Sequence, residues 1–324
     1  MRFFLRLSLF SLLLASAALA QSPAGQLPFE LKLIGPNVWA ALDDAKGDAG
    51  ANAGFVVGDD GVLVIDSFEN ETAAKALLAQ IRTLTKQPIK FVVNTHYHLD
   101  HVAGNRVFAQ QGAVIVGHHS VRAWIHSENL KFFGDKITPE EKAEVASLLA
   151  PGVTYDTGVT IFLGSRRVEV TYLLGHTGGD SVVSIPDASI MFCGDLFWRR
   201  TLPNLIDATT SDWLATLAQF TEQPAEYLTN SGLPPAQIFV PGHGEVGNLE
   251  DVQDFRGYLA WLRAAVQKVK DSGKQGDALV SAVLPDLTTK YGGWAFFSDF
   301  SRSNILDMGA ELQGTKRIPP REKK

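Results

Sequence analysis

The chain has 324 residues, of which 45% are apolar and 20% are charged, and its formal net charge is −6. This composition excludes disorder as the main state, and the length suits one large domain or two ordinary ones. Basic residues are scattered apart from a short run at Lys316–Lys324, so we expect a small-molecule substrate and no nucleic-acid partner. The sequence leaves the oligomeric state open.

The first twenty residues have the pattern of a secretory signal peptide. Two arginines precede the apolar run Leu7–Leu14, and Ala-Leu-Ala at positions 18–20 fits a cleavage site before Gln21. The apolar run is too short to span a bilayer, and no other segment is apolar for long enough. We therefore expect a periplasmic or secreted protein without an integral membrane span. An uncleaved membrane anchor is the alternative.

The first half of the mature chain alternates strands with helices. The sequence Asp-Asp-Gly at 59–61, between two apolar runs, is a strong hairpin signal. Such alternation favours a largely buried mixed sheet. After a flexible lead at 21–30, we expect strands at 37–41, 55–58, 62–66, 90–94 and 113–116, and helices at 72–84, 100–110 and within 121–150.

The second half is first β-rich and then helical, so the sequence predicts an α/β body with a helical C-terminal extension. The single cysteine, Cys193, cannot form an internal disulfide, and we interpret it as a core thiol. We expect strands at 159–162, 167–174, 181–185, 190–193 and 237–240, and helices at 211–222, 252–269, 276–284 and 297–312.

The segment Asn94–His101 concentrates metal-binding side chains directly after a predicted strand, and reads Asn-Thr-His-Tyr-His-Leu-Asp-His. In an extended chain His96 and His98 project to the same side, while Asp100 and His101 lie where a helix would begin. Imidazole and carboxylate donors suit zinc, iron and manganese. Burying three imidazoles and a carboxylate without a metal would cost several kcal/mol, which disfavours a purely structural role.

Four ligands from one loop hold one ion or half of two, so a second set must come from elsewhere. Three glycine-containing turns just past predicted strands supply it: His176 in Gly-His-Thr-Gly-Gly, Asp195 in Cys-Gly-Asp and His243 in Pro-Gly-His-Gly. Glycine lets the backbone bend sharply near a bound ion. The remaining histidines are interpreted as surface or hydrogen-bonded core residues: His118, His119 and His126.

These motifs resemble those of the metallo-β-lactamase superfamily, and they follow the family's order over about residues 30–250. The hairpin that leads to Asp66 is similar to the family's first motif. The resemblance implies a four-layer αβ/βα sandwich with a two-metal site at one edge of the sheets. Together with the residue patterns above, this predicts a signal peptide at 1–20, a catalytic domain at 28–250 and a helical extension at 251–315.

The resemblance also implies roles for the candidate ligands. Asp195 would bridge the two ions, and Asp66 would steady a ligand. Asp100 would be the catalytic residue that orients the attacking hydroxide and later carries a proton. The remaining assignments are His96, His98 and His176 on the first ion, and Asp100, His101 and His243 on the second.

We expect an exported hydrolase with two zinc ions per chain, or iron or manganese in their place. A hydroxide shared by the ions would attack the carbonyl of an ester, thioester, lactone or β-lactam. Two alternatives stay open. One is an iron-dependent oxidoreductase similar to persulfide dioxygenases, and the other is a metal-binding protein without catalysis.

Some residues depart from the family's β-lactamases. Those with a cysteine ligand carry it where this chain has Asp195, and they carry a lysine where it has Trp198. The aspartate bridge instead resembles the glyoxalase II, lactonase and thioesterase-like branches. Arg199 and Arg200 are candidates to replace the lysine. The candidates to line the substrate pocket are Trp124, Phe132, Phe133, Phe197, Trp198, Trp294, Phe296 and Phe297.

Overall fold

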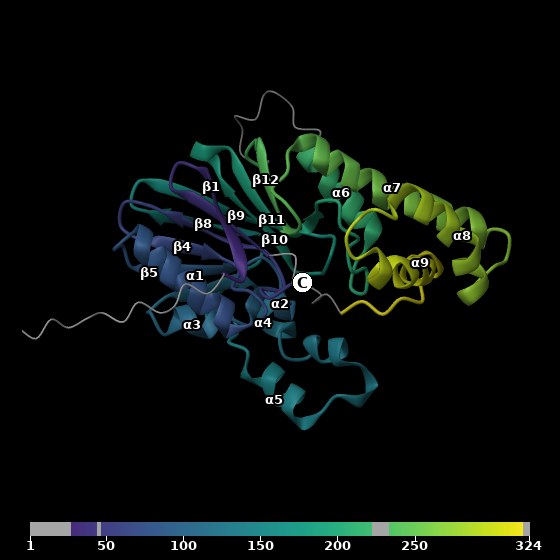
Figure 1. Cartoon of the computed structure of the whole chain (residues 1–324), viewed down its shortest axis with the longest axis horizontal. Helices are drawn as coiled ribbons and strands as arrows, with labels where there is room; N and C mark the ends of the chain where they lie inside the picture. Colours follow the sequence, from purple (N-terminus) through teal and green to yellow (C-terminus); the bar gives the residue numbers. More distant parts are fainter. Residues whose placement is uncertain (1–26, 44–46, 222–232, 320–324) are drawn as a thin grey trace, which may run out of the picture.

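Two β-sheets pack face to face in the computed structural model, and helices cover both outer sides (Figure 1). This is the four-layer α/β sandwich that was expected. The structure describes residues 27–43, 47–221 and 233–319, so the predicted signal peptide lies outside the described residues. Within the described ranges, no helix combines the length and apolar content that crossing a bilayer requires.

The first sheet is mixed. Its first four strands pair antiparallel and its last four pair parallel, which confirms both the mixed sheet and the predicted hairpin between β3 and β4. Its strands, in spatial order, are β1 (Phe29–Gly35), β2 (Val38–Asp43), β3 (Ala53–Val57), β4 (Val62–Ile65), β5 (Ile89–Asn94), β6 (Val114–His118) and β7 (Val153–Tyr155).

In the second sheet, neighbouring strands pair antiparallel, except that β11 and β12 run parallel. Valine, isoleucine and leucine side chains of both sheets meet in one buried cluster between them. Its strands, in spatial order, are β12 (Ile238–His243), β11 (Ile190–Trp198), β10 (Asp180–Ile185), β9 (Arg166–Leu173) and β8 (Gly158–Leu163).

Helix α1 (Glu71–Leu84) covers the outer face of the first sheet with α3 (Asn105–Ala109). It begins at Asn70, whose side chain accepts a hydrogen bond from the backbone of Ala73. Its buried residues recur at helical spacing, so one apolar face meets the sheet.

The second sheet is covered by α6 (Thr210–Thr221) and by the C-terminal helices, which lie together at the right of Figure 1. Phe255 and Tyr258 of the long helix pack in the same buried cluster as Trp213 of α6. The C-terminal helices are α7 (Leu249–Lys270), α8 (Gly276–Tyr291) and α9 (Phe297–Gln313).

Between β6 and β7 lies a helical insert, as expected for 121–150. Thr138 and Glu141 form a capping box at the start of the last helix, which projects away from the sheets in Figure 1. Its elements are α4 (His119–Trp124), a 3-10 segment η1 (Asn129–Lys136) and α5 (Pro139–Ser147).

Three expectations about the elements were wrong. Strand β1 begins inside the expected flexible lead, and the short edge strand β7 was not predicted. The single helix expected at 100–110 is two helices, α2 (Leu99–Val102) and α3. They are separated at Gly104, where a Cβ atom would lie 2.1 Å from the carbonyl oxygen of Ser67. This close backbone approach explains why the chain bends there.

Candidate metal centre

One edge of the sandwich gathers the residues that the sequence singled out. The loop after β5 carries His96 and His98, and α2 begins directly behind them. His176 lies in the loop between β9 and β10, and His243 is the last residue of β12. Segments far apart in the sequence therefore meet at this edge.

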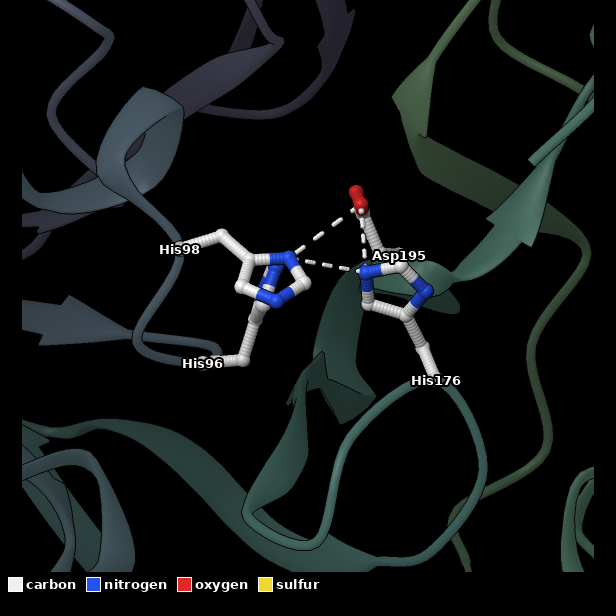
Figure 2. A group of neighbouring side chains, drawn as sticks. All are labelled: His96, His98, His176 and Asp195. Carbon is white, nitrogen blue, oxygen red and sulfur yellow. Dashed lines mark hydrogen bonds and ion pairs between the residues drawn. The ribbon is translucent and has the colours of Figure 1, made fainter. Parts of the chain in front are cut away.

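The first group of side chains comprises His96, His98, His176 and Asp195, whose donor atoms all lie within 4.8 Å of one another. All four are buried, and Figure 2 shows them directed at a common region. His176 Nε2 lies 2.9 Å from His98 Nδ1 and 3.1 Å from Asp195 Oδ2. His96 Nε2 lies 3.7 Å from the same carboxylate oxygen. This spacing suits one cation between them.

The second group comprises Asp100, His101 and His243. His243 Nε2 lies 3.2 Å from Asp100 Oδ2, and His101 Nε2 lies 3.5 Å from the same oxygen. Both imidazoles are buried, whereas the side chain of Asp100 is 27% exposed. Asp100 is therefore the carboxylate of this group that faces solvent.

Asp195 lies between the two groups. Its Oδ2 faces the first group, while its Oδ1 lies 3.1 Å from His101 Nε2 and 3.5 Å from His243 Nε2. One carboxylate thus contacts both sets of imidazoles, the arrangement expected of a group shared by two ions.

Several donor atoms at the site are buried without a hydrogen bond. Because buried polar atoms are normally hydrogen-bonded, such a cluster of unpaired donors is unusual. A cation at each group would satisfy them, so the residues present fit metal ions. The atoms are His96 Nε2, His101 Nε2, His243 Nε2 and Asp195 Oδ1.

Asp195 lies inside β11 and not in a turn after it, contrary to the expectation. Gly194 has a φ of +49°, and the register with β12 shifts on either side of it. The resulting bulge directs the carboxylate toward the site edge. On β12, a Cβ atom on Gly242 would lie 1.9 Å from Asp195 Oδ1, so this glycine leaves the room that the carboxylate occupies.

Asp66 supports the second group, as the resemblance implied. Its Oδ2 lies 2.9 Å from His101 Nδ1. The same carboxylate accepts hydrogen bonds from the backbone and the hydroxyl of Thr95, at 2.8 and 2.7 Å. Asp66 therefore fixes the orientation of His101 and leaves its Nε2 free for the site.

Asp207 supports the first group in the same way, although no local sequence motif predicted it. Its Oδ2 lies 3.0 Å from His98 Nε2. It also accepts short contacts from the hydroxyl of Tyr97 and the ammonium of Lys131. Because Asp207 occupies the Nε2 of His98, it is Nδ1 that faces the site.

Burial keeps two histidines of the first group uncharged. Burial lowers the pKa of His96 well below its usual value, and His101 lowers it further. Burial also lowers the pKa of His98, and Asp207 offsets this only in part. Both imidazoles are therefore neutral near pH 7, which is the form that binds metal.

The carboxylate between the groups stays ionised. Burial alone would raise the pKa of Asp195, but His243 and His101 hold it well below its usual range. Burial likewise would lower the pKa of His243, but Asp195 and Asp100 raise it to about 9. A divalent cation bound at the second group would therefore displace a proton.

A cleft of about 440 Å³ opens over the two groups. Three of the aromatic candidates line it, and Phe300 does so without having been predicted. The lining residues are Gly50, Glu69, His98, Leu99, Asp100, Phe132, His176, Asp195, Trp198, Asn204, His243, Phe296, Asp299 and Phe300.

The other aromatic candidates pack in the core and do not line the cleft. Phe197 is fully buried against Phe255, and Trp124 packs edge-to-face on Tyr97. The rest lie partly buried against core clusters: Phe133, Trp294 and Phe297.

Neither arginine considered as a substitute for the lysine of the cysteine-ligand β-lactamases lines the cleft. Arg199 Nε lies 2.9 Å from Asp251 Oδ1 at the start of α7. Its guanidinium is paired there, and neither candidate stands among the lining residues where it could replace the lysine.

The remaining histidines and the cysteine lie as interpreted. His118 is buried, stacks on Tyr172 and has its Nε2 3.0 Å from a backbone carbonyl. His126 Nε2 lies 2.9 Å from the carbonyl oxygen of Leu148, and His119 is partly exposed. Cys193 is buried in β11, and burial raises the pKa of its thiol. None of them belongs to either group of candidate ligands.

Comparisons with known proteins agree with this architecture. A solved metallo-beta-lactamase from Pontibacter korlensis superposes with a TM-score of 0.56 at 23% identity, covering 72% of this chain and 99% of that one. A linear primary-alkylsulfatase from Pseudomonas sp. is 21% identical over 266 residues, which are 69% of this chain and 48% of the relative.

Two hydroxyacylglutathione hydrolases are also similar. The protein from Synechococcus sp. is 26% identical over 157 residues, or 47% of this chain and 52% of the relative. The protein from Brucella anthropi is 28% identical over 141 residues, or 43% and 45%. The chain thus spans about half the length of these curated relatives.

The family model of the metallo-beta-lactamase superfamily matches residues 47–243, more than half of the chain. The chain belongs to the metallo-β-lactamase superfamily.

Proposed function

We propose that this protein is a hydrolase that uses two divalent cations, zinc in both positions, to cleave carbonyl substrates. The observation that supports it most directly is the convergence of two groups of donor atoms on a single shared carboxylate, that of Asp195. The similarity to two kinds of named hydrolase supports the reaction class.

In this proposal the ligands divide as the two groups do, with Asp195 between them. Each imidazole offers the site one nitrogen, and Asp66 and Asp207 hold the other nitrogen of His101 and His98. The first cation would be held by His96, His98 and His176, and the second by Asp100, His101 and His243.

When bound, such ions lower the pKa of a shared water toward about 7 and polarise a carbonyl oxygen. The chain's own residues then supply position and proton transfer. Asp100, the exposed carboxylate, orients the attacking oxygen and accepts its proton. The proposed substrates are esters, thioesters, lactones and β-lactams, because each presents a carbonyl carbon with a leaving group.

Metal quantification on the purified protein, beside hydrolysis of nitrocefin, a lactone and a thioester, tests this function. We expect two zinc ions per chain and turnover of at least one substrate. One iron per chain with oxygen uptake would instead identify an oxidoreductase of the persulfide dioxygenase kind. Bound metal without turnover on any carbonyl substrate would identify a non-catalytic metal-binding protein.

Substitution of single ligands sharpens this test. We expect His96→Ala to lose the first ion and nearly all hydrolysis while it keeps the fold, as judged by circular dichroism. We expect Asp195→Asn to weaken retention of both ions, because its two oxygens face different groups. Hydrolysis by His96→Ala without bound metal would exclude the mechanism, and two retained ions in Asp195→Asn would exclude the shared carboxylate.

We also propose that the protein is exported to the periplasm or secreted after cleavage before Gln21. The support is the charged, apolar and small-residue pattern of residues 1–20. N-terminal sequencing of protein from the native host should give a chain that begins at Gln21. A chain that retains the first twenty residues would contradict cleavage.

A further inference from the structure

Apart from the cations that the two ligand groups would hold, the charges around the cleft have one sign. Apart from the histidines of the two groups, the ionisable side chains among its described lining residues are all carboxylates. Two of these carboxylates, those of Glu69 and Asp299, line the cleft but belong to neither ligand group.

Two cations near the cleft are already paired. The ammonium of Lys131 contacts the carboxylate of Asp207, and the guanidinium of Arg199 lies against Asp251. Neither residue lines the cleft. A substrate carboxylate that lies beyond reach of the two proposed cations would therefore meet acidic side chains, without a lysine or arginine among the described lining residues.

One wall of the cleft is aromatic. Trp198 stacks on the ring of His243, with centroids 4.0 Å apart. Phe296 and Phe300 lie edge-to-face on Trp198 and on each other, at centroid distances of 6.3, 6.5 and 5.8 Å. Phe132 faces the cleft from the insert, with its ring 4.9 Å from that of His98. An apolar surface thus lies directly beside the candidate metal ligands.

The position of Phe296 is built into the fold. Its φ is +55°, a conformation that costs a non-glycine residue free energy and persists only where neighbours hold it. Backbone hydrogen bonds hold Ala295 between Arg200 and Leu202, next to the end of β11. Even so, the side chain of Phe296 is 39% exposed, and that of Phe132 is 38% exposed. Two large apolar side chains are therefore presented to whatever enters the cleft.

From these observations, and resting on the hydrolytic function proposed above, we propose that the cleft selects substrates with an uncharged, apolar acyl group and rejects those with a carboxylate on that group. Neutral alkyl and aryl esters and lactones belong to the selected class. Half-esters and half-thioesters of dicarboxylic acids, which carry a free carboxylate on the acyl group, belong to the rejected class. The α9 segment of the C-terminal extension supplies this selection through Phe296, Asp299 and Phe300.

Two esters of matched shape test the proposal. p-Nitrophenyl 5-methylhexanoate and the mono-p-nitrophenyl ester of glutaric acid share a leaving group and chain length, and differ in an isopropyl group against a carboxylate. With the uncatalysed rate subtracted, we expect kcat/KM to favour the neutral ester by about tenfold or more, since carboxylates a few ångströms apart repel each other strongly in a partly desolvated cleft. Equal values, or a preference for the acid, would overturn the proposal.

Substitutions in the cleft separate the effect of charge on the ester preference from the effect of hydrophobicity. We expect Phe296→Arg to lower the preference for the neutral ester by about tenfold or more, because it adds a cation to the wall. The double variant Glu69→Gln, Asp299→Asn should lower it several-fold. Phe162→Arg, an exposed site on β8 outside the cleft lining, is the matched control and should leave the preference unchanged. An unchanged preference in Phe296→Arg with normal metal content would contradict the proposal.

A binding measurement distinguishes failure of this proposal from failure of the hydrolytic function. The anilides of the same two acids are titrated calorimetrically into the zinc-loaded protein. We expect the neutral anilide to bind about tenfold more tightly or better, whether or not any ester is cleaved. If neither ester is hydrolysed but the neutral anilide is preferred, the hydrolytic proposal fails and the selection stands. Equal or tighter binding of the acid overturns the selection itself.

Discussion

Single carboxylates outside the two ligand groups decide which nitrogen His98 and His101 offer. Asp66 lies against Nδ1 of His101, and Asp207 lies against Nε2 of His98. The two carboxylates differ in what their positions in the sequence reveal. Asp66 ends a predicted strand of a hairpin that resembles the family's first motif, so a role could be inferred for it. Asp207 lies 109 positions from His98 in a segment without a motif, and only the folded chain brings them together.

The role of Asp207 predicts the effect of a conservative change. In Asp207→Asn the amide keeps the shape of the side chain but loses the charge that faces His98, Tyr97 and Lys131. We expect metal affinity at the first group to fall about 10- to 100-fold, because loss of such supporting carboxylates weakens metal sites by this amount. Competition with a chromophoric chelator measures it.

Asp187→Asn is the matched control, since this exposed carboxylate pairs with Arg166 away from the site. It should leave metal affinity unchanged. If Asp207→Asn also binds both ions with the affinity of the original protein, Asp207 does not position His98.

Among the elements, the parallel strands β11 and β12 determine the position of the Asp195 carboxylate. The sequence placed Asp195 in a turn after a strand, because Cys-Gly-Asp reads as a strand end. Instead the strand continues to Trp198, and a bulge at Gly194 makes the same residue available within it. A bulge depends on the register of the neighbouring strand, which the local sequence does not encode. For the same reason the bend at Gly104 was missed: its cause is the distant carbonyl of Ser67.

The close packing of β12 against β11 predicts that Gly242→Ala disrupts the metal site. The added Cβ would lie 1.9 Å from Asp195 Oδ1, so the carboxylate must move. We expect bound zinc to fall well below that of the original protein, and the metal-free chain to lose about 1–3 kcal/mol of unfolding free energy from overpacking. Metal analysis and urea denaturation measure the two effects.

Gly257→Ala in α7 is the control for this change. No atom lies within 4 Å of the added Cβ, and the position is an exposed helix interior. We expect it to raise the unfolding free energy by about 0.5–1 kcal/mol and to leave metal content unchanged. A Gly242→Ala variant that behaves like this control would show that the two strands leave spare room at Asp195.

For the whole molecule, the sequence predicts the order of most strands and helices, because it rests on the periodicity of apolar residues. It also predicts that the motifs gather at one edge, because their metal-binding residues have a specific spacing. The walls of the cleft were predictable only in part. Phe132, Trp198 and Phe296 line it, but Phe197 and Trp124 are core residues, since an aromatic residue in a sequence carries no sign of which face it will present. The boundary near residue 250, between a catalytic domain and a helical extension, stays a proposal.

The packing of the extension predicts its unfolding behaviour. Residues of β11, α6 and the three C-terminal helices share one buried cluster, which includes Trp213, Phe255 and Ile305. We therefore expect the metal-free protein to unfold in urea in a single transition, with coincident curves from far-ultraviolet circular dichroism and tryptophan fluorescence. Two separated transitions would show that the extension is an independent domain.

We propose that seven side chains from separate segments hold two cations that share Asp195. Zinc-edge anomalous scattering from crystals of the zinc-loaded protein locates these ions. We expect two peaks per chain on either side of the Asp195 carboxylate, one among His96, His98 and His176 and the other among Asp100, His101 and His243. A single peak, or peaks away from these residues, would contradict it.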